Sequence, residues 1–432
     1  RPSRPVDAAD LDLPREQGQS RAAPLCWIPH PGCTASPRST RRRLARHRHA
    51  GTSQRDQLIR QMTTSSLPGD VAVAVIGGGQ AGLATGYFLQ RGGLVPGEDF
   101  VILDAAEQPG GAWPRMWDGL RLFSPATHSS LPGWMMPPWD DATRGFPTRD
   151  HVVDYLGRYE ERYDLGVRRP YKVTSVDRPA DDDPTGPLVV RTPQGDVSAR
   201  VVVSATGTWT RPFWPHCSGA DTFTGQQLHT VQYRRPEDFT GRRVAVVGGG
   251  NSGAQILAEV SAITDTVWLT NRAPRFLPDE VDGRALFTAA TQRVQALRDG
   301  VDHPGVGGLG DIVMIPSVRA ARERGALNAH LMFTRLTPTG VAWTDGAHLD
   351  VDAIIWCTGF RAALNHLTSL DVIEPDGRVE VDEQRSIKEP RLWLAGYGDW
   401  TGAGSATLMG AARTSRDLVS QLVAASALSS QP

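Results

Sequence analysis

The sequence predicts an α/β protein with two Rossmann-like nucleotide-binding units. Two stretches carry this prediction: VAVIGGGQAGLATG (73–86) and VAVVGGGNSGAQIL (244–257) each join an apolar run to a glycine-rich turn and a helical pattern. Two further apolar runs, VVVSATGTW (201–209) and AIIWCTGF (353–360), end alike and flank the second stretch. We therefore expect the second unit to interrupt the first, which makes the first unit discontinuous.

The first glycine-rich turn has the spacing G-x-G-x-x-G at Gly77, Gly79 and Gly82. The β-branched run before it is typical of a strand buried on both faces. Gly77 permits a tight turn, Gly79 lets a pyrophosphate approach the backbone, and Gly82 lets the helix pack closely on the strand. The next apolar run ends at Asp104, where an acid can accept a hydrogen bond from a ribose hydroxyl. The turn predicts a dinucleotide with a free ribose diol, FAD or NAD; the alternative is a purely structural glycine turn.

The second glycine-rich turn repeats this spacing at Gly248, Gly250 and Gly253. Its following strand ends without an acid and presents Asn271 and Arg272 instead. A guanidinium can hold a 2′-phosphate through paired, charge-assisted hydrogen bonds, whereas a carboxylate repels one. We therefore expect NADPH at this turn. The alternative is that Arg272 is an ordinary surface arginine.

Two bound dinucleotides imply that a nicotinamide gives hydride to a flavin, with the protein aligning the two cofactors. The strand ends with Thr206–Gly207 and Thr358–Gly359 flank the second unit. Lacking a bulky side chain at the glycine, such ends suit a close approach to a cofactor or a crossover between domains. They are interpreted as hinge or crossover segments, the alternative being simple strand-to-loop glycines.

The C-terminal stretch LWLAGYGDWTG (392–402) predicts a strand and a glycine turn, followed by a helix. Asp399 in that turn is a candidate acceptor for a flavin ribityl hydroxyl; the alternative is a turn or capping residue. The expected units are an FAD-binding domain over 62–215, a nicotinamide-binding domain over 236–345, and a return to the FAD domain over 346–432.

Composition limits the other function classes. The chain has 432 residues and a formal charge of −1, so no strong field attracts nucleic acid or a membrane surface. No apolar run approaches the roughly 20 residues that span a bilayer. The four cysteines, Cys26, Cys33, Cys217 and Cys357, form no C-x-x-C pair and no zinc pattern, which indicates a reducing cytoplasm and no metal site.

Residues 1–61 differ in character from the rest of the chain. They are rich in arginine, proline and serine and contain RRRLARHRH (41–49). We expect a disordered or non-native leader without function, since the chain opens on Arg1 and Met62 precedes the first strand signal. A basic interaction tail and a transit peptide are the alternatives.

The segment FTGQQLHTVQY (223–233) resembles the F-x-G-x-x-x-H-x-x-x-[W/Y] fingerprint of the flavin-dependent class B monooxygenases. The resemblance covers about 70–425 and includes GGAW (110–113). It is most similar to compact bacterial flavin-containing monooxygenases, including flavoproteins encoded beside arsenic-resistance genes. That similarity lies in DGLRLFSPATHSSLPGW (118–134), RFLPDEVDGR (275–284) and GGLGDIVMIP (307–316).

The resemblance implies an FAD-dependent monooxygenase that consumes NADPH, and in some relatives NADH. It implies that O2 reacts through a C4a-(hydro)peroxyflavin, from which one oxygen atom passes to a sulfide, an amine or, in Baeyer–Villiger oxidation, a ketone. Relatives are commonly dimers, so a homodimer is expected. Two alternatives remain: an NAD(P)H oxidase or electron-transfer reductase of the same fold, and a nucleotide-binding redox sensor.

Site residues follow from the resemblance, residue by residue. The FAD contacts it implies are Gly77, Gly79, Gln80 and Gly82 at the pyrophosphate, Asp104 at the ribose, Val173 at the adenine, Ala112 and Trp113 along the flavin, and Asp399 at the ribityl chain. The NADPH pyrophosphate contacts it implies are Gly248, Gly250, Asn251, Ser252 and Gly253.

Phe123 and His229 are the two candidate catalytic residues, and each has an alternative interpretation. Phe123 occupies the segment where many family members place an asparagine beside the flavin, a departure that favours the oxidase alternative. His229 belongs to the fingerprint, and a structural role in coupling the domains is at least as plain a reading as catalysis. Trp113, Trp117, Trp134, Trp139 and Trp400 suggest an aromatic-lined pocket, with buried core as the alternative.

Overall fold

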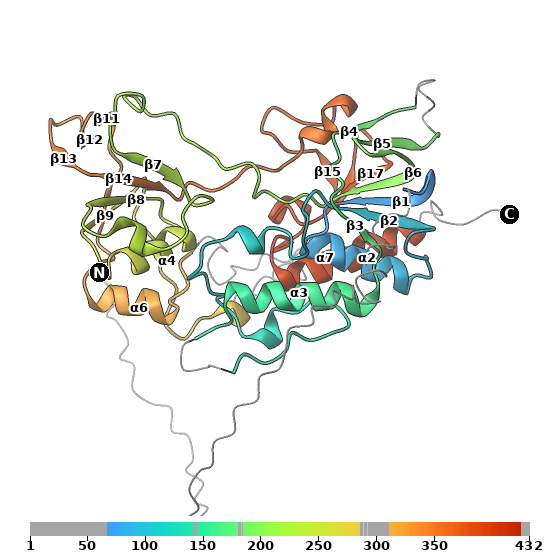
Figure 1. Cartoon of the computed structure of the whole chain (residues 1–432), viewed down its shortest axis with the longest axis horizontal. Helices are drawn as coiled ribbons and strands as arrows, with labels where there is room; N and C mark the ends of the chain where they lie inside the picture. The colour runs from blue at the N-terminus through green and yellow to red at the C-terminus, as the bar shows by residue number, and fades with distance from the viewer. Residues whose placement is uncertain are drawn as a thin grey trace, which may run out of the picture. The chain divides into compact units, whose positions relative to one another are not determined.

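Two larger sheets organise the chain, one mixed and one parallel (Figure 1). The computed structural model describes residues 67–140, 145–179, 185–285 and 311–424, with Asp183, Thr288 and Gln292 in addition. The described residues all belong to one compact unit. The expected leader, 1–61, and two of the four cysteines, Cys26 and Cys33, lie outside the described residues.

The larger sheet has nine strands, and its central strand β1 pairs in parallel with β2 and β6. Six of the seven residues of β1 are buried, as the continuous apolar run predicts for a strand covered on both faces. The strands are β1 (Asp70–Ile76), β2 (Phe100–Leu103), β3 (Val167–Arg168), β4 (Ser175–Asp177), β5 (Leu188–Thr192), β6 (Gly195–Ser204), β15 (Val381–Asp382), β16 (Arg385–Ser386) and β17 (Leu392–Leu394). Strands from both ends of the described chain thus share one sheet, which confirms the discontinuous first domain.

The two faces of this sheet bury different partners. Helices α2 (Gln80–Arg91), α3 (Arg149–Tyr163) and α7 (Leu408–Ala424) lie on one face (Figure 1). Leu83 and Leu89 of α2 are fully buried there, and each such leucine contributes about 2 kcal/mol through burial. On the other face, side chains of β4 and β5, which join the sheet through β6, and of the short 3-10 helix η5 (Asn365–Leu370) form the core.

The smaller sheet contains five parallel strands in the order β10-β9-β8-β14-β7. Helices α4 (Asn251–Val260) and α6 (Pro316–Glu323) cover one face, and a three-stranded antiparallel sheet packs on the other. The strands are β7 (Gln226–His229), β8 (Val244–Val247), β9 (Thr266–Thr270), β10 (Ala329–Leu331) and β14 (Ala353–Trp356), with β11 (Arg335–Thr337), β12 (Gly340–Ala342) and β13 (His348–Asp350) in the antiparallel sheet. The predicted α/β fold with two nucleotide-binding domains is confirmed.

Sheet pairing corrects the boundaries expected for the second unit, 236–345. Strand β7 begins at residue 226 and pairs with β14, which the sequence assigned to the returning FAD domain at 346–432. Strand β14 also pairs with β8. By pairing, the second unit therefore runs from β7 to β14. The glycine motif marks the start of a nucleotide-binding motif, whereas the edges of a sheet depend on partners distant in sequence.

Two chain segments cross between the sheets, one after each Thr-Gly strand end. They run alongside each other, because the Phe213 amide donates to the Gly359 carbonyl at 2.9 Å and the Ala363 amide donates to the Gly207 carbonyl at 2.9 Å. Trp209 and Phe360 stack with ring centroids 5.3 Å apart. The expected crossover is thus a paired two-segment connection. Among the described residues, no helix is long and apolar enough to cross a membrane.

Candidate functional site

A cavity of about 930 Å³ is bordered by the first glycine-rich turn and by the start of α4, the helix that follows the second turn. The sequence-predicted residues that line it are Gly77, Gly79, Gln80, Asp104, Ala112, Trp113, Phe123, Val173, Thr206, Gly207, Asn251 and Ser252. They come from β1 and α2, the ends of β2 and β6, three loops and the first turn of α4. The structure therefore brings together residues that the sequence spreads over about 180 positions.

The first turn is built so that only glycine fits at two of its positions. Gly77 has a φ of +111°, and a Cβ there would lie 2.5 Å from the Ala205 carbonyl oxygen. A Cβ on Gly82 would lie 1.8 Å from the carbonyl oxygen of Gly77. Gly79 is different, because the nearest atom to a Cβ there is 3.7 Å away. Its backbone therefore leaves open space at the start of α2, where free amides and the helix dipole favour a phosphate.

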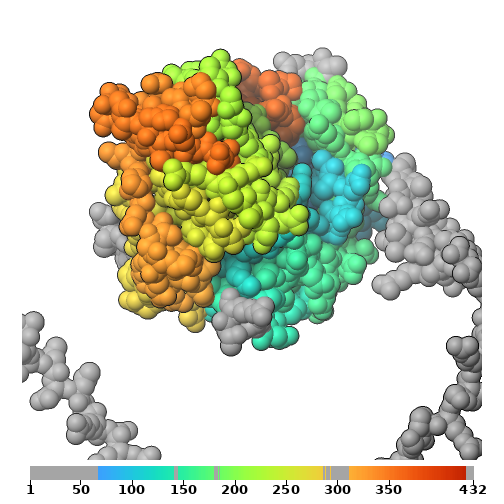
Figure 2. Space-filling view, turned by 60° about the vertical axis from the view of Figure 1, so that its left-hand side comes forward, coloured from blue at the N-terminus to red at the C-terminus, as the bar shows by residue number. Residues whose placement is uncertain are grey.

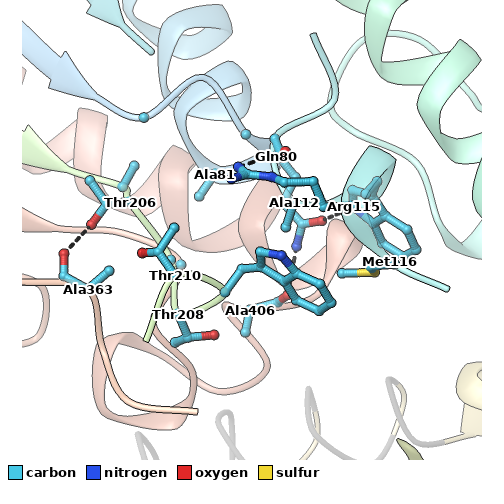
Figure 3. A pocket seen from close by; sticks show the side chains of 18 of the residues that line it. Gln80, Ala81, Ala112, Arg115, Met116, Thr206, Thr208, Thr210, Ala363 and Ala406 are labelled. Atoms are coloured by element: carbon cyan, nitrogen blue, oxygen red, sulfur yellow. Dashed lines mark hydrogen bonds between the residues drawn. The ribbon is translucent and has the colours of Figure 1, made fainter. Parts of the chain in front are cut away.

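Gln80 ties this turn to two other segments of the cavity wall. Its Oε1 accepts from the Trp113 indole at 3.1 Å, and its Nε2 donates to the Ala406 carbonyl at 2.6 Å. Figure 3 shows Gln80 close to Ala112 and Ala406. The first turn, the GGAW segment and the return segment before α7 are thus joined by one amide side chain.

Asp104 lines the cavity and is only 8% exposed. Its Oδ2 accepts from Arg169 Nε at 2.9 Å, and Arg169 also donates to both oxygens of Glu160, at 2.5 and 2.9 Å. Burial raises the pKa of Glu160, while these bonds outweigh burial and raise the pKa of Arg169. A carboxylate offers about four lone-pair sites, so Asp104 keeps acceptor capacity for a ribose hydroxyl.

The second turn repeats the steric design of the first. Gly248 has a φ of +129°, and a Cβ on Gly253 would lie 2.2 Å from the Gly248 carbonyl oxygen. Asn251 occupies the place that Gln80 has in the first turn and also bridges segments: it donates to the Asp311 carbonyl and accepts from the Val313 amide, both at 2.9 Å. Gly248, Gly250 and Gly253 form the turn but do not line the cavity.

Asn271 and Arg272 are exposed beyond the end of β9, beside the second turn. The Arg272 carbonyl oxygen would lie 4.0 Å from a Cβ on Gly249. Within the described part of the chain, the Arg272 guanidinium has no carboxylate partner. The arginine is therefore available to an anionic ligand at this turn, and its assignment to a 2′-phosphate stays a prediction.

Several predicted site residues lie away from the cavity. Asp399, in the 3-10 helix η6 (Asp399–Thr401), accepts from the Gly404 amide at 3.2 Å and so acts as a turn residue. His229 is fully buried, its Nε2 pairs with the Gly359 carbonyl at 3.1 Å, and burial lowers the pKa of its imidazole. This geometry favours the domain-coupling interpretation over catalysis. Thr358 also bonds within the crossover, donating to the Phe213 carbonyl at 2.6 Å.

The tryptophans divide between the cavity and the core. Trp113 and Trp117 line the cavity. Trp134 lies against Tyr155, Trp139 against His151 and Trp400 against Tyr397. The aromatic-pocket expectation therefore fits two of the five.

A polar chain beside the cavity was missed by sequence reasoning. His366 Nε2 pairs with Ser204 Oγ at 2.9 Å, Ser204 with the Tyr397 hydroxyl at 2.6 Å, and Tyr397 with Thr206 Oγ1 at 2.7 Å. Thr206 donates onward to the Ala363 carbonyl at 2.7 Å, the contact drawn in Figure 3. Burial lowers the pKa of His366 to about 4, so its ring is neutral at pH 7. The one sequence feature that pointed to this chain of hydrogen bonds is the serine, Ser204, at the end of the buried strand β6.

Comparison with known proteins places the chain in a family. Residues 74–306 match the family described as pyridine nucleotide-disulphide oxidoreductase. The solved flavin-containing monooxygenase from Stenotrophomonas maltophilia is 46% identical, with a TM-score of 0.74, and the match covers 83% of this chain and 99% of that chain. The oxidoreductase CzcO of Bacillus subtilis is 27% identical, with 81% of this chain and 98% of that protein covered.

A Baeyer–Villiger monooxygenase of Streptomyces coelicolor is also 27% identical, over 78% of this chain and 71% of that protein. The expected resemblance is therefore confirmed, and with it the prediction of an enzyme of the oxidoreductase class. Because the family match spans more than half of the 432 residues and the 46% identity extends over 83% of them, this chain belongs to the flavin-containing monooxygenases of the pyridine nucleotide-disulphide oxidoreductase family.

Proposed function

We propose that this enzyme binds FAD at the first glycine turn and NADPH at the second, and transfers one oxygen atom from O2 to a small organic substrate. The observation that carries the proposal is that one cavity is lined by the first turn and by the start of α4. Two dinucleotides held at those turns would direct their reactive ends into a shared space. Two solved proteins of the same fold contain these cofactors: a steroid monooxygenase binds NADP, and OTEMO binds FAD and NADP.

The residues fit these cofactors in distinct ways. The open backbone at Gly79 and the first turn of α2 suit a pyrophosphate, and Asp104 suits a ribose. Gln80 holds Trp113, and with it the GGAW segment, against the turn. When bound, FAD supplies hydride acceptance and the activation of O2, and the protein supplies orientation and a site closed to water.

The substrate is expected to be small and largely uncharged, such as a sulfide, an amine or a ketone. Apolar side chains of the cavity wall support this: Met116, Trp117, Leu120, Leu122, Phe123, Phe360 and Met409. Such a lining excludes water, which would otherwise divert the reduced oxygen to hydrogen peroxide.

Phe123 favours a second candidate function, an NAD(P)H oxidase. Its side chain lines the cavity and offers no hydrogen-bond donor, in the segment where many relatives have an asparagine. The segment itself is anchored, since the Phe123 carbonyl accepts from the Gly283 amide at 2.7 Å. A substitution at Phe123 therefore changes the side chain without releasing the backbone.

The test is the ratio of oxygenated product to hydrogen peroxide after anaerobic reduction by NADPH and admission of air with a thioether or a cyclic ketone. We expect product to account for most of the NADPH consumed, and Phe123→Asn to raise the ratio by up to about tenfold through the added donor. Stoichiometric peroxide without product, in both proteins, would assign the enzyme to the oxidases.

Replacing Arg272 by alanine is expected to raise the KM for NADPH about tenfold and to leave kcat unchanged. The substitution removes one charge-assisted hydrogen-bonding group from the 2′-phosphate, which lies away from the reacting atoms. The KM for NADH should not change, because NADH has no 2′-phosphate. Arg200→Ala, which removes an exposed arginine of β6, is the matched control. Equal rises for both nucleotides would show that Arg272 does not contact the 2′-phosphate.

A further inference from the structure

A mostly buried carboxyl without a cation partner lies at the contact between the two nucleotide-binding units. Glu259, in the last turn of α4, accepts from the Trp117 indole at 3.1 Å on Oε1 and from the Tyr233 hydroxyl at 2.9 Å on Oε2. Trp117 is 3% exposed and Tyr233 is fully buried. No arginine, lysine or histidine among the described residues pairs with this carboxyl. Buried carboxyls are usually paired, so this one calls for an explanation.

The three residues come from three parts of the functional machinery. Trp117 belongs to the segment 115–120, from which Arg115, Met116 and Leu120 also line the cavity. Tyr233 is the last residue of the fingerprint. Glu259 belongs to the helix that starts at the second glycine turn and lines the cavity at its other end. The two parts of the chain adjoin on the face shown in Figure 2, drawn in cyan to teal and in yellow-green.

The contact is tight and supported by the backbone. A Cβ on Gly119 would lie 2.2 Å from Glu259 Oε1, so the segment closes directly over the carboxyl. The Asp118 amide donates to the Arg234 carbonyl at 2.9 Å, and Arg234 Nη1 donates to the Arg115 carbonyl at 2.6 Å. Neither the backbone hydrogen bond nor the one from the Arg234 side chain involves the Glu259 side chain. A change at Glu259 should therefore alter the fit of the segment without unfolding it.

We propose that Glu259 is a positioning residue that holds the cavity-lining segment 115–120 against the nicotinamide-side helix α4, and that it does so best as the neutral acid. In that form Oε1 still accepts from Trp117 and the Oε2 hydroxyl donates to the Tyr233 oxygen, which leaves no charge to bury. The proposal rests on NADPH binding at the second turn.

The surroundings favour the neutral acid. Burial outweighs the hydrogen bonds from Tyr233 and Trp117, which favour the ionised form, and with the negative charges of Glu237 and Asp118 it raises the pKa of Glu259 to about 7. The neighbouring cations are engaged elsewhere: Arg149 with Asp118 and Asp150, and Arg324 with the Ala258 carbonyl. Because the folded-state pKa lies above the unfolded one, this contribution to stability is complete in acid and is lost as the pH rises through about 7.

The experiment compares the holoenzyme with Glu259→Gln, which has the shape and the hydrogen bonds of the neutral acid. Two quantities are measured between pH 6 and 8.5: Tm, and the Kd for NADP⁺ from the change in flavin absorbance. In the natural protein we expect Tm to fall and Kd to rise about fivefold across this range, with a midpoint near 7. The glutamine variant should show neither change. Glu237→Gln removes an exposed negative charge that helps to raise the pKa of Glu259, so it should move both profiles to slightly lower pH without abolishing them.

Each possible result of this experiment tests a different part of the proposal. Identical profiles for the natural protein and Glu259→Gln would overturn the proposal. A changed Tm profile with an unchanged Kd profile would reduce Glu259 to a structural residue and would also overturn it. Failure to bind NADP⁺ at any pH would overturn the nicotinamide half of the proposed function as well. Neither measurement depends on oxygen transfer, so the product-to-peroxide test stands apart.

Discussion

Gly82→Ala is expected to abolish FAD binding and to lower the free energy of unfolding by at least about 3 kcal/mol, the upper range for overpacking. The new Cβ would meet the Gly77 carbonyl oxygen at 1.8 Å and the Gly77 carbonyl carbon at 3.0 Å. Neither is free to move, because the Gly77 amide donates to the Leu103 carbonyl at 2.7 Å and its φ is +111°. Since a whole domain is stable by about 5–15 kcal/mol, such a loss is large.

Gly79→Ala is the matched control, three residues away in the same turn. Its Cβ would find its nearest neighbour, Gly111 Cα, at 3.7 Å, an ordinary contact, and its φ of −82° suits any residue. The apoprotein should keep its Tm, while the Kd for FAD rises because the methyl group occupies the approach of the pyrophosphate. Tm by circular dichroism and FAD content by absorbance measure both effects.

Together, the two variants separate the effect of the turn on stability from its effect on FAD binding. Unchanged Tm in Gly82→Ala would contradict the geometry of the turn. Unchanged FAD affinity in Gly79→Ala would show that the pyrophosphate lies elsewhere. The second turn offers a repeat of the comparison for NADPH, since a Cβ on Gly253 would lie 2.2 Å from the Gly248 carbonyl oxygen whereas one on Gly250 meets nothing within 4 Å.

Arg169→Met is expected to destabilise the protein by about 3–5 kcal/mol at pH 7, because it leaves two buried carboxylates without their cation. The side chains of Arg169, Asp104 and Glu160 are only 9%, 11% and 16% exposed. Burial already raises the pKa of Glu160, and the loss of the arginine, which lowers it, should raise that pKa further. The loss should therefore shrink as the pH falls towards 5, which urea denaturation at the two pH values measures.

Arg158→Met provides the control, on the helix α3 that also carries Glu160. Arg158 pairs with Asp154 at 3.2 Å, but the two side chains are 53% and 61% exposed, so this substitution should cost less than about 1 kcal/mol. Equal losses for the two variants would mean that the buried cluster contributes no more than a surface pair. The FAD content of Arg169→Met should also fall, since Asp104 loses the group that orients it.

The two nucleotide-binding turns were predictable because their requirements are local. The carbonyl that excludes a side chain at Gly82 belongs to Gly77, five residues earlier, and the same holds for Gly253 and Gly248. Strand, turn and helix follow one another directly in both copies, so the spacing of the glycines is enough to recognise them. The α/β fold and the interrupted first domain follow from this local pattern and its repetition, whereas the family was recognised from the fingerprint at 223–233.

Tertiary structure alone decided the contacts between segments distant in the sequence. Asp104 is paired by Arg169, 65 residues later, and Glu259 by Trp117, 142 residues earlier. Strand β14 belongs to the second sheet through β7 and β8, although its sequence closely resembles the end of β6. One carboxylate oxygen of Asp399 accepts a hydrogen bond from the Gly404 amide. A local pattern records which side chains prefer burial or a turn, but not which distant donor, cation or strand edge they meet once the chain has folded.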